Sequence, residues 1–167
     1  GQQKFWMIGD MAKAESIIEY VIKSNILFDL KFAGRKAFDI FRIEQGIPSA
    51  PEEINLFFNP YDINLISEVS FNKGCYIGQE VIAKIESSGK AGRNLYGAIF
   101  DEPLEMEETL PVQDAEGNEA GKLTSVAKSG LTGKFIGLTV LKAQGITEGQ
   151  TFFAVKDGNK LKFKVTK

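Results

Sequence analysis

The sequence contains no histidine and only one cysteine, Cys75, among its 167 residues. Without histidine, every Ser-His or Cys-His nucleophile–base pair is excluded. Structural zinc sites need about four nitrogen or sulfur ligands, so this composition predicts no metal site. A single cysteine cannot form an internal disulfide, which favours a reducing compartment. We therefore expect a protein of the cytoplasm, or of the mitochondrial matrix in a eukaryote.

Long apolar runs and an excess of positive charge are also missing. No apolar run approaches the roughly 20 residues that span a bilayer, so no membrane partner is expected. The formal net charge is −2, whereas domains that bind nucleic acids electrostatically usually have a clear basic excess, so no nucleic-acid partner is indicated. The sequence begins GQQKFWMIGD, without an initiator methionine or a signal peptide. We expect the natural protein to begin upstream.

The first half of the chain mixes strand-like and helical segments. Lys4–Ile8 and Ile26–Lys31 are typical of short strands. After Asp10, which can cap a helix, apolar residues recur at helical spacing and predict an amphipathic helix; they are Ala14, Ile17, Ile18, Val21 and Ile22. Further helices are expected over residues 35–45, where Gly46 ends the helix, 49–57 and 79–86.

From Gly89 onward almost every segment is typical of a strand. The expected strands cover residues 94–100, 111–114, 120–127, 134–142, 151–156 and 160–165. Asp157-Gly158-Asn159 is a strong hairpin signal, and the lysines alternating with apolar residues in the last strand are typical of an exposed sheet edge. Short strands at regular spacing predict a small barrel or sandwich. We therefore expect an α+β chain with a boundary near Gly89, giving domains 1–88 and 89–167.

The stretch SFNKGCYIGQEVIAKI, residues 70–85, holds the single thiol. Cys75 precedes the expected opening turn of a helix, where free backbone N–H groups and the helix dipole favour a thiolate. The ammonium group of Lys73 adds to this effect, and Gly74 and Gly78 let a ligand approach the backbone. The alternative is that Cys75 is a small buried hydrophobic residue, and the residues alone leave both interpretations open.

The stretch FRIEQGIP, residues 41–48, is the second candidate site. Arg42 and Glu44 lie just before the glycine that ends the helix. A carboxylate beside a pocket can accept two parallel hydrogen bonds from a ligand with adjacent N–H donors. The alternative is an ordinary charged helix end on the surface.

Together these stretches resemble a known family. KGCYIGQE, residues 73–80, resembles the signature of the YgfZ-type folate-binding proteins, which are relatives of the glycine-cleavage T-protein, an aminomethyltransferase. Further segments are similar to family segments in the same order: RIEQGIP at 42–48, PYDINL at 60–65, GRNLYG at 92–97 and GKLTSV at 121–126. This resemblance runs from about Arg35 to Ser125.

The resemblance implies the C-terminal part of a T-protein-like fold, with an α/β segment followed by a small antiparallel β-barrel. It implies that Glu44 accepts hydrogen bonds from the amino-pyrimidinone edge of the pterin of tetrahydrofolate. It also implies that Cys75 is a functional thiol, with Lys73 beside it as the second catalytic residue. The residues expected to bind the folate are Glu44, Arg42, Tyr76, Gly74, Gly78 and Gln79.

In function, the resemblance implies a tetrahydrofolate-binding protein that supports iron–sulfur cluster assembly or repair, with folate and iron–sulfur client proteins as partners. The alternative is an enzyme, an aminomethyltransferase that takes a one-carbon unit from a lipoyl carrier protein to tetrahydrofolate. A third is a non-catalytic interaction module. Family members are usually far longer, so a missing N-terminal segment or a second chain is expected to complete the pocket. Asp62 stands where the family more usually has glutamate, which puts a ligand role for it in doubt.

Overall fold

The structure, a computed structural model, describes residues 7–24, 29–89, 91–142 and 145–166. The chain divides into two compact units, Gly1–Gly34 and Arg35–Lys167, and each is described by itself. In the described ranges, no helix has the length and apolar character needed to cross a membrane.

In residues 7–24 and 29–34, the first unit contains one 3-10 turn and one helix. The turn η1 spans Met11–Lys13 and the helix α1 spans Ala14–Ser24, as the apolar spacing predicts. Asp10 caps this segment, because its side chain accepts a hydrogen bond from the backbone N of Ala12 at 3.0 Å. Of the two strands expected here, residues 4–6 and 26–28 lie outside the described residues. The remaining parts, residues 7–8 and 29–31, form no strand.

The second unit begins with α2, Arg35–Glu44, which ends where predicted. Gly46 takes a left-handed conformation with φ 67°, and the backbone N of Ile47 donates to the carbonyl of Arg42 at 2.8 Å. This left-handed glycine is a common way to end a helix, since it satisfies carbonyls of the last turn.

The helix expected over residues 49–57 does not form. Only a turn is present, in which the backbone N of Glu53 donates to the carbonyl of Ser49 at 2.9 Å. The side chain of Asn55 donates to the carbonyls of Pro51 and Glu52 and accepts from the backbone N of Phe57. These local bonds offer the backbone an alternative to helical hydrogen bonding. A 3-10 turn, η2, and a helix, α3, follow at Ile66–Glu68 and Gln79–Ser88.

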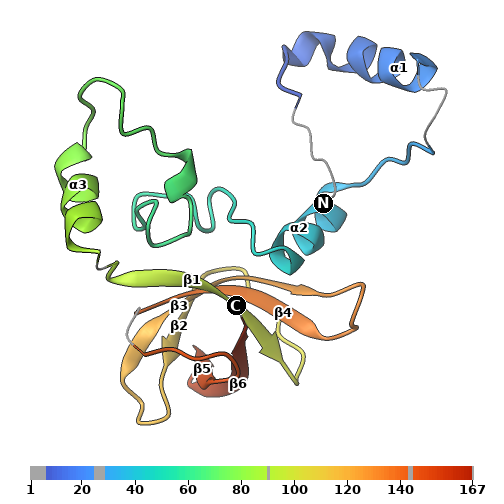
Figure 1. Ribbon diagram of the computed structural model, residues 1–167. Coiled ribbons are helices and arrows are strands. Elements are labelled where there is room, and N and C mark those ends of the chain that lie inside the picture. Colours follow the sequence, from blue (N-terminus) through green and yellow to red (C-terminus); the bar gives the residue numbers. More distant parts are fainter. Residues whose placement is uncertain (1–6, 25–28, 90, 143–144, 167) are drawn as a thin grey trace. The chain divides into compact units, whose positions relative to one another are not determined.

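The rest of the unit is a closed antiparallel barrel (Figure 1). Its strands are β1 Arg93–Phe100, β2 Leu110–Gln113, β3 Glu119–Lys128, β4 Phe135–Lys142, β5 Thr151–Lys156 and β6 Asn159–Thr166. The strands are hydrogen-bonded in the order β1-β4-β3-β2-β5-β6. The structure therefore confirms the predicted α+β class and shows that the strands close into a barrel.

The barrel interior is filled by buried apolar side chains, which in β6 alternate with exposed residues. In β6, Phe163 and Val165 are buried while the three lysines of the strand are exposed, as the alternation predicts. The rings of Phe100 and Phe163 lie 5.1 Å apart between centroids. Asp157 and Gly158 both have positive φ, which is the geometry of a two-residue hairpin turn.

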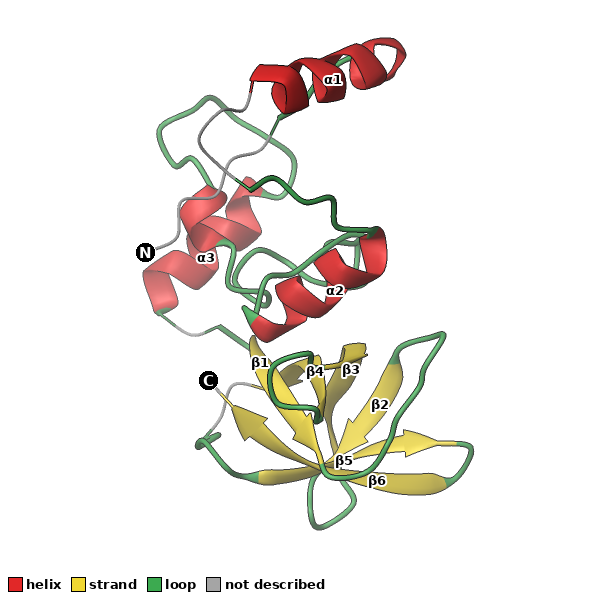
Figure 2. Cartoon of the chain, turned by 90° about the vertical axis from the view of Figure 1, so that its right-hand side faces the viewer, coloured by secondary structure: helices red, strands yellow, loops and turns green. Residues whose placement is uncertain are grey.

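Helix α2 packs on the outside of the barrel, against β3 and β4 (Figures 1 and 2). Ile43 from the helix joins a second apolar cluster with Ile63, Leu95, Leu138 and Val140. The compact unit therefore starts at Arg35. The boundary predicted near Gly89 falls inside this unit, before the barrel strands begin at Arg93.

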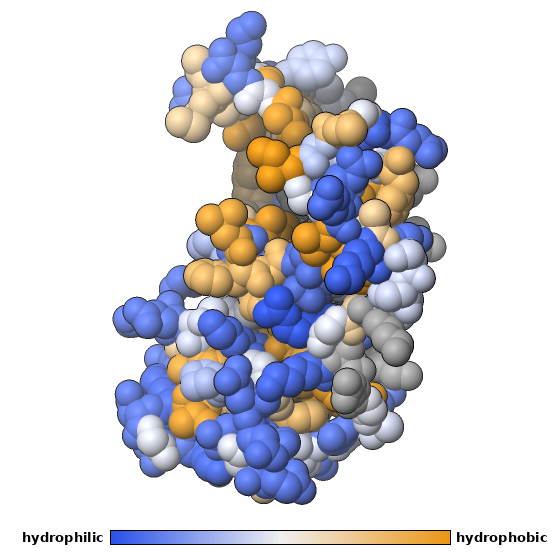
Figure 3. Space-filling model, turned by 90° about the vertical axis from the view of Figure 1, so that its left-hand side faces the viewer, coloured by the Kyte–Doolittle hydropathy of each residue, from blue (hydrophilic) through white to orange (hydrophobic). Residues whose placement is uncertain are grey.

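Apolar side chains that remain exposed in this unit lie mainly outside the barrel. They include Leu56, Phe57, Ile77 and Val81. On the face shown in Figure 3, the barrel surface is largely hydrophilic.

Candidate functional site

Glu44 occupies the last position of α2, where the packing of that helix brings it to the β3–β4 turn. Its Oε1 accepts a hydrogen bond from the hydroxyl of Ser129 at 2.6 Å. No described residue donates a hydrogen bond to its second carboxylate oxygen, Oε2. Glu44 is half-buried, so one carboxylate oxygen is fixed by the protein and the other is available.

Two hollows meet at Glu44. The first has a volume of about 280 Å³ and the second about 400 Å³. Glu44, Gly97 and Thr166 line both. The first is lined in addition by Asn64, Leu95, Tyr96 and Leu138, and the second by Ser129, Leu131, Thr132, Lys134, Ile136 and others. Small-molecule sites usually enclose roughly 300–1,000 Å³, so the first hollow lies just below this range and the second at its lower end. Volumes of this size suit a ring system rather than a whole folate.

Ser129 is almost fully buried, at 3% exposure, and its hydroxyl is fully used. Its Oγ accepts from the backbone N of Leu131 at 3.1 Å and of Thr132 at 3.0 Å, and it donates to Glu44. A hydroxyl has one proton and two lone pairs, so these three bonds saturate it. The sequence gives no signal for this residue, because Ser129 lies 85 positions from Glu44.

Arg42, which was expected to bind the folate, is almost fully buried and its guanidinium is held by protein groups. Its Nε donates to Asp39 at 3.0 Å, its Nη1 to Glu53 at 3.0 Å and its Nη2 to Ser125 at 2.9 Å. Glu53 is fully buried and also accepts from the backbone N of Ser49 and from the hydroxyl of Ser125. This buried network ties α2 to the following turn and to β3.

Asp39 completes this network at the protein surface. Burial raises the pKa of Asp39, but hydrogen bonds from Arg42 and Arg35, together with their charges, outweigh it. The pKa of that carboxyl therefore lies below its usual value, and Asp39 is an acceptor for both guanidinium groups.

Asp62 is also structural. It is almost fully buried and its Oδ2 accepts from Arg93 at 2.9 Å and from the backbone N of Asn59 at 3.1 Å. The guanidinium of Arg93 lies 5.4 Å from the ring centroid of Phe58. PYDINL and GRNLYG, two of the segments that carried the resemblance, thus contact each other to hold the start of β1.

Cys75 is exposed, so it is not the buried hydrophobic residue of the alternative interpretation. It does not begin a helix, however, because α3 starts at Gln79 with Gly78 as N-cap. The dipole effect fades within the first turn of a helix, so this placement weakens the argument from the helix dipole. The ammonium of Lys73 lies 4.8 Å from the ring centroid of Tyr76, on which it packs.

The glycines of this loop have different roles. Gly78 has φ 88°, a conformation that side chains other than glycine adopt only with strain. Around Gly74, a Cβ would meet no other atom within 4 Å, so the backbone there is open to a ligand. The backbone N of Gln79 donates to the carbonyl of Tyr76 at 3.2 Å, which closes the turn into α3.

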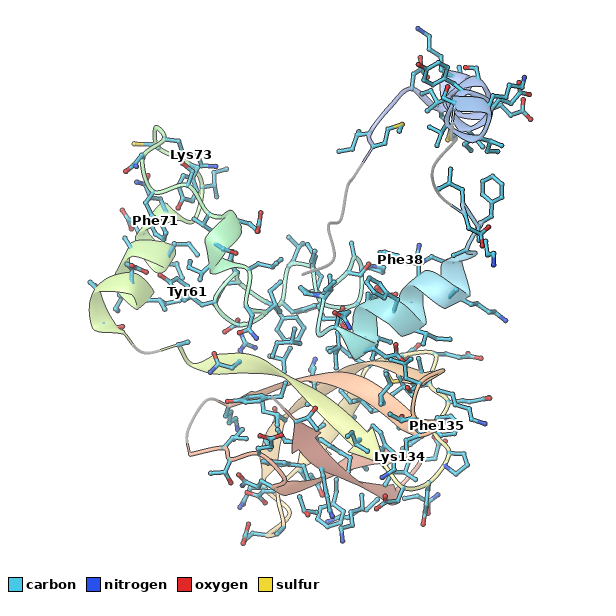
Figure 4. All side chains as sticks on the ribbon, turned by 45° about the vertical axis from the view of Figure 1, so that its right-hand side comes forward. Phe38, Tyr61, Phe71, Lys73, Lys134 and Phe135 are labelled. Carbon is cyan, nitrogen blue, oxygen red and sulfur yellow. The ribbon has the colours of Figure 1, made fainter. Side chains whose placement is uncertain are left out.

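The structure does not place the thiol loop at Glu44. The two hollows beside Glu44 include no residue of the range 73–79. Figure 4 shows Lys73 in the loop before α3, away from the barrel surface where Lys134 lies. The two halves of the predicted site are therefore separate within this chain. In the described ranges, no three His, Cys, Asp or Glu side chains are grouped to hold a metal ion.

Comparison with known proteins gives several relatives. No protein-family profile matches the chain. It is 33% identical over 124 residues to an Arabidopsis thaliana protein named as a chloroplastic transferase, covering 74% of this chain and 28% of that protein. It is 34% identical over 119 residues to the mouse mitochondrial iron–sulfur cluster assembly factor IBA57, covering 64% of this chain and 30% of that protein.

A solved structure shares the fold. The glycine cleavage system aminomethyltransferase T from Bartonella henselae superposes with a TM-score of 0.74 at 19% identity, over 93% of this chain and 43% of that protein. This chain therefore spans less than half the length of each of these three proteins. The closed barrel, the order of the motifs and these relatives all support one assignment. The chain belongs to the superfamily of the glycine-cleavage T-protein and the YgfZ-type proteins.

Proposed function

We propose that this chain is the part of a YgfZ-type protein that holds the pterin ring of tetrahydrofolate at Glu44, and that the protein supports iron–sulfur cluster assembly or repair through Cys75. The observation that carries the proposal is the carboxylate of Glu44, whose Oε1 accepts a hydrogen bond from Ser129 and which lines two hollows. The mouse relative is named as an iron–sulfur cluster assembly factor, which supports the second part.

The chemistry of Glu44 matches a pterin. The amino-pyrimidinone edge of this ring carries two adjacent N–H donors, and a carboxylate is the side chain that accepts both. Oε2 of Glu44 has free acceptor capacity, and Oε1 keeps one lone pair beyond the bond from Ser129. The hollows offer space for a ring but not for a whole folate, so the rest of the ligand would contact other parts of the full-length protein.

The exposed thiol fits a role in brief exchange of metal or sulfur. One cysteine cannot hold an iron–sulfur cluster alone, because such clusters need about four ligands. Cys75 would therefore contact a cluster only together with a client protein. Its exposure and the open backbone at Gly74 leave room for such a partner. Lys73, Tyr76, Gly78 and Gln79 would shape this loop, with the cation–ring contact of Lys73 and Tyr76 fixing its fold.

Calorimetric titration of the full-length gene product with 5-formyltetrahydrofolate tests the Glu44 site. Glu44→Gln keeps the size of the side chain but replaces one acceptor by a donor. Hydrogen bonds to a charged group contribute about 1.5–3 kcal/mol, so the affinity should fall about 10- to 150-fold. Glu102→Gln is the matched control, because Glu102 is exposed and forms no hydrogen bond or ion pair with a described residue. Equal affinity of wild type and Glu44→Gln would disprove the proposed site.

The second function, aminomethyl transfer, is separated from the first by two activity assays. Cells that lack the gene should regain cluster-enzyme activity with the wild type but not with Cys75→Ser, since serine removes the soft sulfur ligand. Full rescue by Cys75→Ser refutes the thiol role. Release of ammonia from an aminomethyl-lipoyl carrier protein, with tetrahydrofolate present, would instead establish the aminomethyltransferase.

A further inference from the structure

We infer that Ser129 is a positioning residue that makes the Glu44 site selective for a ligand edge made of donors only. The inference rests on the proposed function, because it concerns how the Glu44 carboxylate recognises a pterin-like ring.

The direction of the Ser129 proton is fixed by its neighbours. Two backbone N–H groups, of Leu131 and Thr132, point at Oγ and occupy both lone pairs. Among the residues that the structure describes, the acceptor of the hydroxyl proton is Oε1 of Glu44, 2.6 Å away. The hydroxyl therefore cannot turn round to accept a proton from Glu44, and Oε1 is held as an acceptor.

The turn that carries Ser129 is itself closed by backbone bonds. The backbone N of Ser129 donates to the carbonyl of Lys134 at 2.8 Å, and Gly133 donates to the carbonyl of Ser129 at 3.0 Å. Gly133 has φ 71°, which other residues adopt only with strain. Because every polar group of Ser129 has a partner, its hydroxyl is a rigid anchor for the end of the Glu44 side chain.

A fixed carboxylate has a consequence for the ligand. At the end of its side chain Glu44 offers only acceptors, because the proton of Ser129 is already donated to Oε1. A ring with an amino group and a ring N–H beside each other satisfies both oxygens. A ring with a carbonyl in place of that amino group would bring its carbonyl oxygen next to a carboxylate oxygen of Glu44, and the two would repel each other. The hydrogen bond from Ser129 keeps the carboxylate from rotating to relieve this repulsion.

The experiment compares 5-formyltetrahydrofolate with its 2-deamino-2-oxo analogue, which carries a carbonyl in place of the amino group. Both are titrated against the full-length wild type, Ser129→Ala and Ser129→Thr, with thermal unfolding followed for each variant. Wild type should bind the amino compound at least about tenfold more tightly. Ser129→Ala should lose most of this ratio, and Ser129→Thr, which keeps the hydroxyl, should restore it.

The ratio of the two affinities distinguishes a positioning role from general damage to the site. A site that is merely distorted would bind both ligands more weakly by the same factor. If Ser129→Ala keeps the wild-type ratio while Glu44→Gln abolishes binding, the inference is wrong and the proposed function stands. If the wild type binds neither compound, the inference about Ser129 and the proposed function are both wrong. Should Ser129→Ala be too unstable to titrate, Glu44→Asp tests the same link from the other side. Aspartate is one methylene too short to contact Ser129 and the ligand together, and an unchanged ratio there would also overturn the inference.

Discussion

Removing the charge of Arg42 tests whether the buried network holds α2 on the barrel. Arg42→Met keeps a long apolar stem but leaves Glu53 buried at 0% exposure without its cation. Breaking a buried ion pair by removing one partner typically costs about 3–5 kcal/mol. With total stabilities of about 5–15 kcal/mol for ordinary domains, this is a large share of the whole.

Urea unfolding followed by circular dichroism measures this cost. At an m-value of about 2 kcal/mol/M, the midpoint should fall by about 1.5–2.5 M. The double variant Arg42→Met/Glu53→Leu removes both charges and should be more stable than the sum of the single effects predicts, with a coupling energy of about 2 kcal/mol. A coupling below about 0.5 kcal/mol would show that the two charges do not stabilise each other, and the account of α2 would be wrong.

Three further predictions concern other parts of the chain. Gly121→Ala should destabilise the barrel by about 3 kcal/mol or more, because the added Cβ would lie 2.1 Å from a backbone carbonyl oxygen of β4. In the control Gly92→Ala, the added Cβ has no other atom within 4 Å, so the melting temperature should change little. Burial, and then the hydrogen bond to Glu86, raise the pKa of Tyr61 to about 12. The folded state therefore binds the Tyr61 proton more tightly than the unfolded chain does. The wild type should lose stability as the pH rises from about 10 to about 12, and Tyr61→Phe should not show this loss. The exposed Cys75 should react with iodoacetamide in the native protein within a few-fold of its rate in urea; a hundredfold slower reaction would contradict its exposure.

The barrel could be predicted because its signals are local. Alternation in β6 and the turn at Asp157–Gly158 depend on neighbouring residues, and each of the six expected strands lies within two residues of an observed one. The helix expected over 49–57 was wrong for a reason that propensities do not capture. There the side chain of Asn55 binds the backbone on both sides.

The site was only partly predictable, because its partners are distant in sequence. The sequence around Arg42 and Glu44 predicted where α2 ends, but nothing local shows that one side chain turns to Glu53 and the other to Ser129. Ser129 looks like an ordinary turn residue in the sequence. Its role depends on α2 packing across β3 and β4, which is a property of the folded chain.

A crystal structure of the full-length protein with 5-formyltetrahydrofolate bound tests the central claim most directly. The account predicts that both N–H groups of the pterin edge lie within about 3.2 Å of the Glu44 carboxylate, with the Ser129 bond to Oε1 kept. A ligand bound elsewhere, or bound in the hollows without contact to Glu44, would contradict it.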